Sequence, residues 1–493
     1  MRRSTGWRAG LVGVIALAAA TPAAIAADDP SSNAKGCAAP TGLVVNRWVG
    51  QTAAGEVGLW TQNSNWSLGK APGRRATKQV VCIRSAARVV IPVGADLRVH
   101  VAAVDIDGTV DGPAEVVVLR SNGLYVEAAP QLVKSHVAGG SQLRVKGGAL
   151  GGAGLILAEG EVVLNAEKGW TNVLSTRACG AFPAPGSCAT PPSTAERVGT
   201  LQVSGGGRLR INNGLTLVTD GYDVRVAGGQ LFMSGEGGRV SADAGTSLTL
   251  LPARRVAGQP VRPVLVFEND GGWYAGDNPF ALIGTRVSLN GATVRKAYGT
   301  GTSTIGGEVT TKEVVRADVQ TGSLSVALAT VKVKATLTPD TAYSTGTCSV
   351  PGSPEYDCAP AATPMDTAIA SVGLPESAAA TQLSITEKDS AAGATGTAIV
   401  VDMPALDVSR SDPAVLTLRY DASVVGARTP LTARIAVHSK GTYRDLGDCT
   451  TSGTIPEGFG RCVDRRAGHS FVDTDGDLVM EVHTQHFSRF ICR

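Results

Sequence analysis

The sequence contains few aromatic residues and almost no excess of either charge. Phe, Trp and Tyr make up 4% of its 493 residues, and 45 Lys and Arg residues stand against 42 Asp and Glu residues. The three surplus positive charges, Arg2, Arg3 and Arg8, all lie within the first ten residues. The rest of the chain is neutral, so there is no electrostatic basis for binding nucleic acid or an anionic membrane surface. Because 43% of the residues are apolar, a packed core is still expected.

Long apolar runs are also lacking outside the N-terminus. Residues 1–26 combine a positively charged start, the apolar run 11–20 and small residues at Ala24 and Ala26, which is typical of a secretory signal peptide. The apolar run is too short to span a bilayer. We therefore expect cleavage near Ala26 and a secreted or extracellular mature protein, held at the cell surface at most by non-covalent contacts, with no membrane span.

The nine cysteines occur without any Cys-x-x-Cys spacing, and no histidine lies near a local pair, so neither a metal site nor a cofactor is predicted. An oxidising compartment favours disulfides instead. Three pairs enclose short loops rich in Gly, Pro, Ser and Thr and are predicted to be bonded: Cys179 with Cys188, Cys348 with Cys358, and Cys449 with Cys462. By elimination Cys37 is paired with Cys82, which leaves Cys492 unpaired or bonded to a second chain; the oligomeric state is not predicted.

A regular rhythm of short β-rich segments and Gly, Asn or Asp turns runs through residues 79–298. In residues 201–250, seven such segments begin 7 to 9 residues apart, and apolar residues alternate within each. Strands this short suit a coil in which each strand stacks on its equivalent one turn later. The pattern predicts an all-β fold with a right-handed parallel β-solenoid. The alternative is a multi-hairpin antiparallel fold, because Asp-Gly and Asn-Gly turns are also hairpin signals.

The preceding segment, residues 27–78, holds a cluster of three tryptophans, Trp48, Trp60 and Trp66. The end of a solenoid exposes unpaired strand edges and needs a cap, so we expect this cluster to pack as one. The alternative is a platform on which sugars stack. The pattern of these tryptophans with Asn65, Ser67, Gly69 and Pro72 resembles the start of β-solenoid passenger and adhesin-like modules of exported bacterial proteins. The resemblance covers residues 44–130 and implies a surface or secreted protein without catalytic residues in this module.

Residues 299–382 are expected to be a strand-containing linker, and residues 383–493 a C-terminal β-sandwich. The segments 412–423 and 475–490 resemble the C-terminal β-sandwich of many exported bacterial proteins, which is distantly similar to a module of ankyrins and netrin receptors. Such modules are mostly structural or bind proteins. In some animal relatives a matching His-Phe-Ser is a site of self-cleavage. Here His486, Phe487 and Ser488 match it, but the cut would release only six residues, so we expect an intact chain.

A catalytic site would need clustered carboxylates on one face of the solenoid. The best candidates are dispersed: Asp220, Asp223, Asp243, Glu268, Asp270 and Asp277. No motif of a nucleophile elbow, a zinc protease or a phosphate-binding loop occurs. We therefore expect a secreted or envelope-associated structural or adhesive scaffold without catalytic activity, with envelope polysaccharide or surface proteins as partners. The alternatives are a carbohydrate-active solenoid enzyme, either a polysaccharide lyase or a hydrolase, and a carbohydrate-binding protein that uses the tryptophans.

Overall fold

The computed structural model describes residues 39–50, 57–83, 87–92, 98–107, 114–119, 122–127, 134–166, 170–176, 199–243, 245–256, 259–275, 285–328, 332–345, 368–388, 395–403, 406–420, 427–439, 442–472 and 476–492. The predicted signal peptide lies outside them. Ala39–Arg493 forms one compact unit by its internal contacts. Within the described residues the fold is all-β, with no α-helix and one 3-10 turn, η1 (Asn63–Asn65), so none of their helices could cross a membrane.

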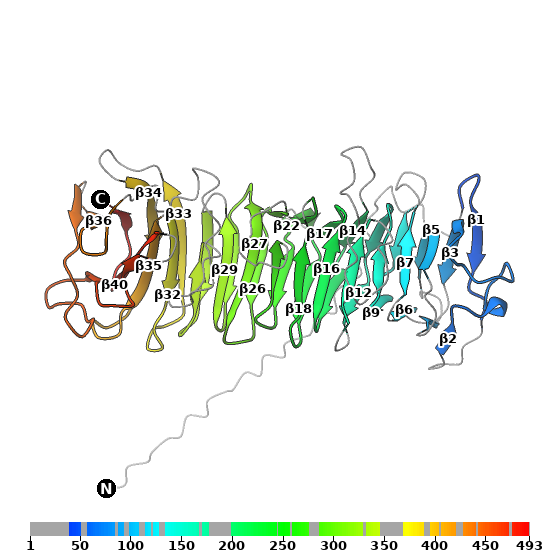
Figure 1. The fold of residues 1–493 in the computed structure, drawn as a ribbon, viewed down its shortest axis with the longest axis horizontal. Coiled ribbons are helices and arrows are strands. Elements are labelled where there is room, and N and C mark those ends of the chain that lie inside the picture. Colours follow the sequence, from blue (N-terminus) through cyan, green and yellow to red (C-terminus); the bar gives the residue numbers. More distant parts are fainter. Residues whose placement is uncertain are drawn as a thin grey trace, which may run out of the picture. The chain divides into compact units, whose positions relative to one another are not determined.

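Most strands belong to two large sheets, which are mixed: parallel in their first part and antiparallel in their last (Figure 1). In the parallel part, a strand does not pair with the next strand of the chain. It pairs with a strand two or more places later, which follows after the chain has formed the intervening strands. Leu209, for example, pairs with Leu231, and Leu231 with Leu265. The strands form three such parallel ladders, and the chain visits the ladders in turn. Two of the ladders belong to the first sheet and one to the second.

The first sheet begins with β1 (Val44–Arg47), β3 (Ala76–Ile83) and β5 (Arg98–Ile106), and β5 pairs with the first strand of each of its two ladders. One ladder comprises β7 (Gly123–Val126), β10 (Ala149–Gly151), β13 (Asn172–Ser175), β16 (Leu215–Thr219), β19 (Arg239–Ala242) and β24 (Gly272–Ala275). The other comprises β8 (Ser135–Val137), β11 (Leu155–Ala158), β14 (Thr200–Ser204), β17 (Asp223–Ala227), β20 (Ser247–Leu251) and β25 (Arg286–Leu289). Both ladders end on β27 (Thr302–Thr310), followed by β29 (Ser323–Leu328) and β31 (Ala342–Ser344).

The second sheet carries the third ladder. It comprises β2 (Val57–Leu59), β4 (Arg88–Ile91), β6 (Glu115–Leu119), β9 (Gln142–Lys146), β12 (Glu161–Asn165), β15 (Arg208–Asn212), β18 (Gln230–Ser234), β23 (Val264–Phe267), β26 (Thr293–Lys296), β28 (Val315–Val319) and β30 (Lys332–Leu337). A separate hairpin of β21 (Ala253–Val256) and β22 (Gln259–Val261) projects from this region. All seven strands predicted in residues 201–250 are present, and their pairing is parallel. The multi-hairpin alternative is therefore wrong for this region.

The core is built from columns of apolar residues that occupy the same register position on successive strands. In one column Leu201, Val224, Leu248 and Val287 follow one another, and all four are fully buried. The alternation within each short strand explains this arrangement, because in-register stacking places every second side chain above its equivalent. One continuous apolar core extends from Trp48 to Cys492 among the described residues.

The two sheets become antiparallel toward the C-terminus. On the first sheet the strands are β32 (Ala368–Gly373), β35 (Ala414–Tyr420), β40 (Leu478–Thr484), β38 (Arg461–Asp464) and β39 (Phe471–Val472). On the second they are β33 (Thr381–Lys388), β34 (Thr395–Asp402), β41 (Arg489–Cys492), β36 (Ile435–Ser439) and β37 (Thr442–Asp445). β30 pairs directly with β33, so strand pairing continues across the boundary predicted at residue 382.

Candidate functional site

The three tryptophans of the capping segment are buried against one another. Trp48, Trp60 and Trp66 are 7%, 0% and 2% exposed, and the ring of Trp66 lies 5.1 Å from that of Trp48 and 4.8 Å from that of Trp60, edge to face. The indole nitrogen of Trp60 donates a hydrogen bond to the carbonyl oxygen of Pro72. A sugar stacks only on an exposed ring face. The hypothesis that these three tryptophans contact a ligand is therefore wrong, and they are core residues.

The predicted disulfide between Cys449 and Cys462 is present, with their Cα atoms 4.9 Å apart. Cys82 is also disulfide-bonded, and its predicted partner Cys37 lies outside the described residues. The remaining predicted pairs fall outside the described residues as well: Cys179 with Cys188, and Cys348 with Cys358.

Four of the acidic residues singled out for an enzyme have individual partners, and Asp243 lies exposed directly after β19. Three have basic partners: Asp223 with Arg225 (2.7 Å), Glu268 with Arg210 (3.0 Å), and Asp270 with Lys296 (2.5 Å). Asp220 accepts a hydrogen bond from the Ser175 hydroxyl, and Asp277 lies outside the described residues. A pocket of about 480 Å³ near the C-terminal region, lined by residues from the 409–411 and 450–457 loops, contains one carboxylate, that of Glu457. This does not supply the two carboxylates that glycoside hydrolysis requires.

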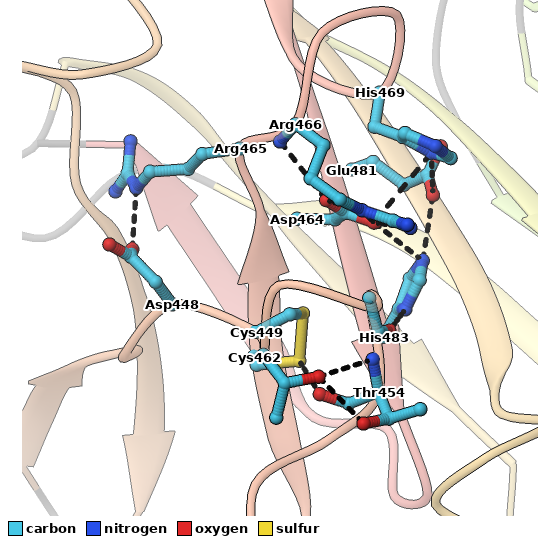
Figure 2. Close-up of a disulfide and its surroundings, with 12 residues drawn as sticks. Asp448, Cys449, Thr454, Cys462, Asp464, Arg465, Arg466, His469, Glu481 and His483 are labelled. Atoms are coloured by element: carbon cyan, nitrogen blue, oxygen red, sulfur yellow. Dashed lines mark hydrogen bonds and ion pairs between the residues drawn. A yellow bond between two sulfur atoms is a disulfide. The ribbon is translucent and has the colours of Figure 1, made fainter.

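A different group of side chains, Asp464, His469, Glu481 and His483, gathers where β38 and β40 pair (Figure 2). In the antiparallel register Asp464 lies opposite Glu481, and Cys462 lies opposite His483. Side chains alternate along a strand, so these residues share one face of the sheet while the intervening residues of β40 enter the core. His469 comes from the turn between β38 and β39 and completes the cluster.

The polar atoms of the four side chains are close together. Nδ1 of His469 lies 2.9 Å from Oε1 of Glu481 and 3.7 Å from Oδ2 of Asp464. Nε2 of His483 lies 2.7 Å from the same Glu481 oxygen and 3.7 Å from the same Asp464 oxygen. Asp464 is fully buried and His483 nearly so, whereas the side chain of His469 is 39% exposed. The cluster therefore has a buried floor and an accessible rim.

The loop between the disulfide-bonded cysteines fixes the orientation of His483. Nδ1 of His483 lies 2.6 Å from the carbonyl oxygen of Gly453, which can only accept a hydrogen bond, so Nδ1 carries a proton. Gly453 has a φ of +82°, a conformation that favours glycine, and lies in the loop closed by Cys449 and Cys462. Nε2 of His483 is consequently the nitrogen that faces the two carboxylates.

Arg466 holds Asp464 in place. Its backbone N–H and its Nε both donate to Oδ1 of Asp464, at 3.1 and 2.9 Å, and its Nη2 donates to Oδ2. Burial alone would raise the pKa of Asp464, but the hydrogen bonds from Arg466 lower it below the usual value. Burial alone would lower the pKa of His483, but hydrogen bonds to Glu481 and to the Gly453 carbonyl raise it.

The sequence analysis did not find this cluster. Of the histidines in this region, only His486 was singled out from the sequence, as part of the His-Phe-Ser match, and His486 lies exposed beyond the end of β40 at Thr484. The available signal was the alternation of Glu481 and His483 on a predicted strand, with Asp464 and His469 a short distance upstream. Recognising the four as neighbours requires the register between β38 and β40, which the sequence does not specify.

No family of known proteins, no curated protein and no solved structure matches this chain. The residues themselves therefore carry the functional argument.

Proposed function

We propose that this chain is an exported structural or adhesive scaffold, secreted or associated with the cell envelope, and without catalytic activity. Its parallel part would be a right-handed β-solenoid capped by the tryptophan cluster, and its antiparallel part a β-sandwich module. Envelope polysaccharide or surface proteins would be its partners. The signal-like segment 1–26 and the disulfide-bonded cysteines support export.

The observation that carries the proposal is the pattern of charges along the third ladder. Side chains that face away from the core neutralise one another along this ladder. On neighbouring strands, Arg88 pairs with Glu115 (2.9 Å), Arg144 with Glu115 (3.0 Å) and Arg210 with Glu161 (3.6 Å). Arg210 also reaches past β18 to Glu268, just after β23 (3.0 Å). Cross-strand pairs of this kind stabilise a sheet and its register. A catalytic face would instead gather carboxylates whose charges are not neutralised by neighbouring arginines.

The proposal is tested with the purified mature chain. N-terminal sequencing of the exported protein is expected to begin just after Ala26. Incubation with a panel of envelope and plant polysaccharides is expected to release no reducing ends, while the folded chain sediments with isolated cell envelopes of the source organism. An unrelated exported β-protein of similar size serves as the control for non-specific sedimentation.

The enzyme alternative predicts a different result. Release of reducing ends that disappears in a variant of Glu268 or Asp270, in a chain that remains folded, would show that the chain is a carbohydrate-active enzyme. Failure to sediment with envelopes, together with no release, would contradict the scaffold proposal.

A further inference from the structure

We propose that Asp464, His469, Glu481 and His483 bind one divalent transition-metal ion of the zinc class. The ligand atoms would be Oδ2 of Asp464, Nδ1 of His469, Oε1 of Glu481 and Nε2 of His483, which all lie within 4.8 Å of one another (Figure 2). The inference goes beyond the proposed scaffold function, because it concerns a metal site that a scaffold does not require.

The distances between these atoms fit a tetrahedral site. Ligands about 2.0 Å from a tetrahedral zinc ion are separated from one another by about 3.3 Å. The nitrogen-to-oxygen distances in the cluster are 2.7, 2.9, 3.7 and 3.7 Å, which lie on both sides of that value. Each of these four distances differs from that value by about half an ångström, and all four ligand atoms lie within 4.8 Å of one another.

Two of the ligands are already oriented by contacts outside the cluster. Metal-binding histidines usually donate their other ring N–H to a carbonyl or a carboxylate, and His483 does so to Gly453 at 2.6 Å. For Asp464, Arg466 holds both carboxylate oxygens: its backbone N–H and Nε donate to Oδ1, and its Nε and Nη2 donate to Oδ2 at 3.0 and 2.5 Å. Oδ2 is also the oxygen that lies 3.7 Å from each imidazole nitrogen, so it would bind the ion through a lone pair that Arg466 does not use. These outer contacts, one from Arg466 and one from the loop closed by the disulfide, pre-organise the two ligands on their paired strands.

The ligand set indicates the kind of ion and its role. Two imidazoles with two carboxylates suit zinc-class ions better than calcium or magnesium, which prefer sets of oxygen ligands. Four protein ligands would leave no open position for a substrate, which is typical of a structural site. The ion would join β38, the turn that carries His469 and β40, next to the Cys449–Cys462 disulfide.

The test uses the mature chain, purified without a histidine tag and with its disulfides intact, and first stripped of metal with a chelator. Zn²⁺ is titrated against a chromophoric competitor, and Tm is measured with and without Zn²⁺. We expect a site with one ion per chain and a rise in Tm on its occupation. Substitution with Co²⁺ is expected to give the visible absorption bands of a tetrahedral site.

The variant His469→Gln removes one ligand at the accessible rim, and its effect on folding is checked by its circular dichroism spectrum. We expect it to weaken Zn²⁺ binding at least tenfold and to abolish the Co²⁺ bands. The matched control is His486→Gln, which removes an exposed imidazole nearby and is expected to bind like the wild type. Binding by His469→Gln equal to that of the wild type would overturn the proposal. So would no stoichiometric binding by the wild type, which would leave the cluster as a network of ion pairs. Neither result would bear on the scaffold function, because the sedimentation and reducing-end assays do not involve this site.

Discussion

Lys296 and Asp270 form an ion pair at 2.5 Å although Lys296 occupies a core position. On the third ladder Lys296 lies in register between Phe267 and Val319, both fully buried, and is itself 0% exposed. Its ammonium group reaches out of the apolar column to Oδ1 of Asp270 and to the carbonyl oxygen of Asn269. Burial lowers the pKa of this ammonium, and the hydrogen bond to Asp270 partly offsets the effect.

Substitutions of Lys296 should separate its charge from its packing. Lys296→Met keeps an unbranched stem in the column, and the 47% exposed Asp270 side chain can return to water. We therefore expect a stability within about 1 kcal/mol of the wild type, or above it. Lys296→Ala leaves a void between Phe267 and Val319 and is expected to cost about 2–4 kcal/mol. Chemical denaturation of the two variants checks this; equal loss in both would mean that the ion pair, and not the packing, stabilises the ladder.

The close stacking of successive strands should be sensitive to a single methyl group at Gly160. A Cβ there would lie 2.3 Å from the carbonyl oxygens of both Ala138 and Ser141, which belong to the preceding turn. Gly160→Ala is therefore expected to destabilise the chain by about 1–3 kcal/mol. Gly139→Ala is the control, because nothing lies within 4 Å of its Cβ, and it should be neutral or slightly stabilising. Equal Tm values for both variants would contradict the stacking described here.

The sequence predicted the strands well because the signal is local. Alternating apolar residues bounded by glycine turns are visible within single segments, such as Arg208–Asn212, and they define both the strand and its buried face. The spacing of the segments also indicated that each strand pairs with one a period later. These features depend on the spacing of apolar residues along the chain, which can be measured directly in the sequence.

The cluster at β38 and β40 could not be predicted in the same way. Its geometry depends on the antiparallel register that places Asp464 opposite Glu481, and on a turn that returns His469 to the same face. The burial of the tryptophans was likewise ambiguous, because a row of indoles can form a cap or a binding platform until its neighbours are known. Lys296 is a further example. A charged residue at an inward-facing position of a strand can be explained only when its partner, Asp270, is known to lie beside it.

His136 should make stability depend on pH. Contacts with Asp105 and Glu159, with nitrogen-to-oxygen distances of 3.5 and 3.4 Å, raise the pKa of its imidazole to about 9 in the folded chain. The usual value, which applies to the unfolded chain, is about 6.5, so the protonated form is favoured by folding. The stabilisation is complete below pH 6.5 and is lost as the pH rises through 9. The full shift in pKa corresponds to about 3 kcal/mol, and solvent screening at this partly exposed site reduces the stabilisation to the order of 2 kcal/mol.

The measurement compares Tm of the wild type with that of His136→Gln between pH 6 and pH 10. The wild type should be the more stable at pH 6, and the difference should vanish near pH 10. His486→Gln, which removes an exposed imidazole, controls for a general effect of losing a histidine. A difference that stays constant over this range would show that His136 acts by packing alone.

Cys492 should be a thiol that reagents reach only after unfolding. It is not part of a disulfide, it is 0% exposed, and its strand β41 pairs with both β34 and β36. A second chain cannot reach this sulfur without opening the sheet, which argues against the intermolecular bond left open by the sequence. We expect no alkylation of native protein and one alkylated cysteine per chain in denaturant. A disulfide-linked dimer on a non-reducing gel would contradict this.

The chain should remain intact at the match to the self-cleaving motif. Attack by Ser488 on the preceding carbonyl would need its hydroxyl free and a base to accept the proton. The Ser488 hydroxyl instead donates a hydrogen bond to the carbonyl oxygen of His438 at 3.0 Å, and the exposed His486 is not its acceptor. The side chain of Arg461 donates to the carbonyl oxygen of His486, which further holds this segment in place. Mass spectrometry of the purified protein should therefore give a chain ending at Arg493 in both the wild type and Ser488→Ala. A species ending at Phe487 in the wild type, and absent from Ser488→Ala, would show that the segment rearranges into a reactive geometry.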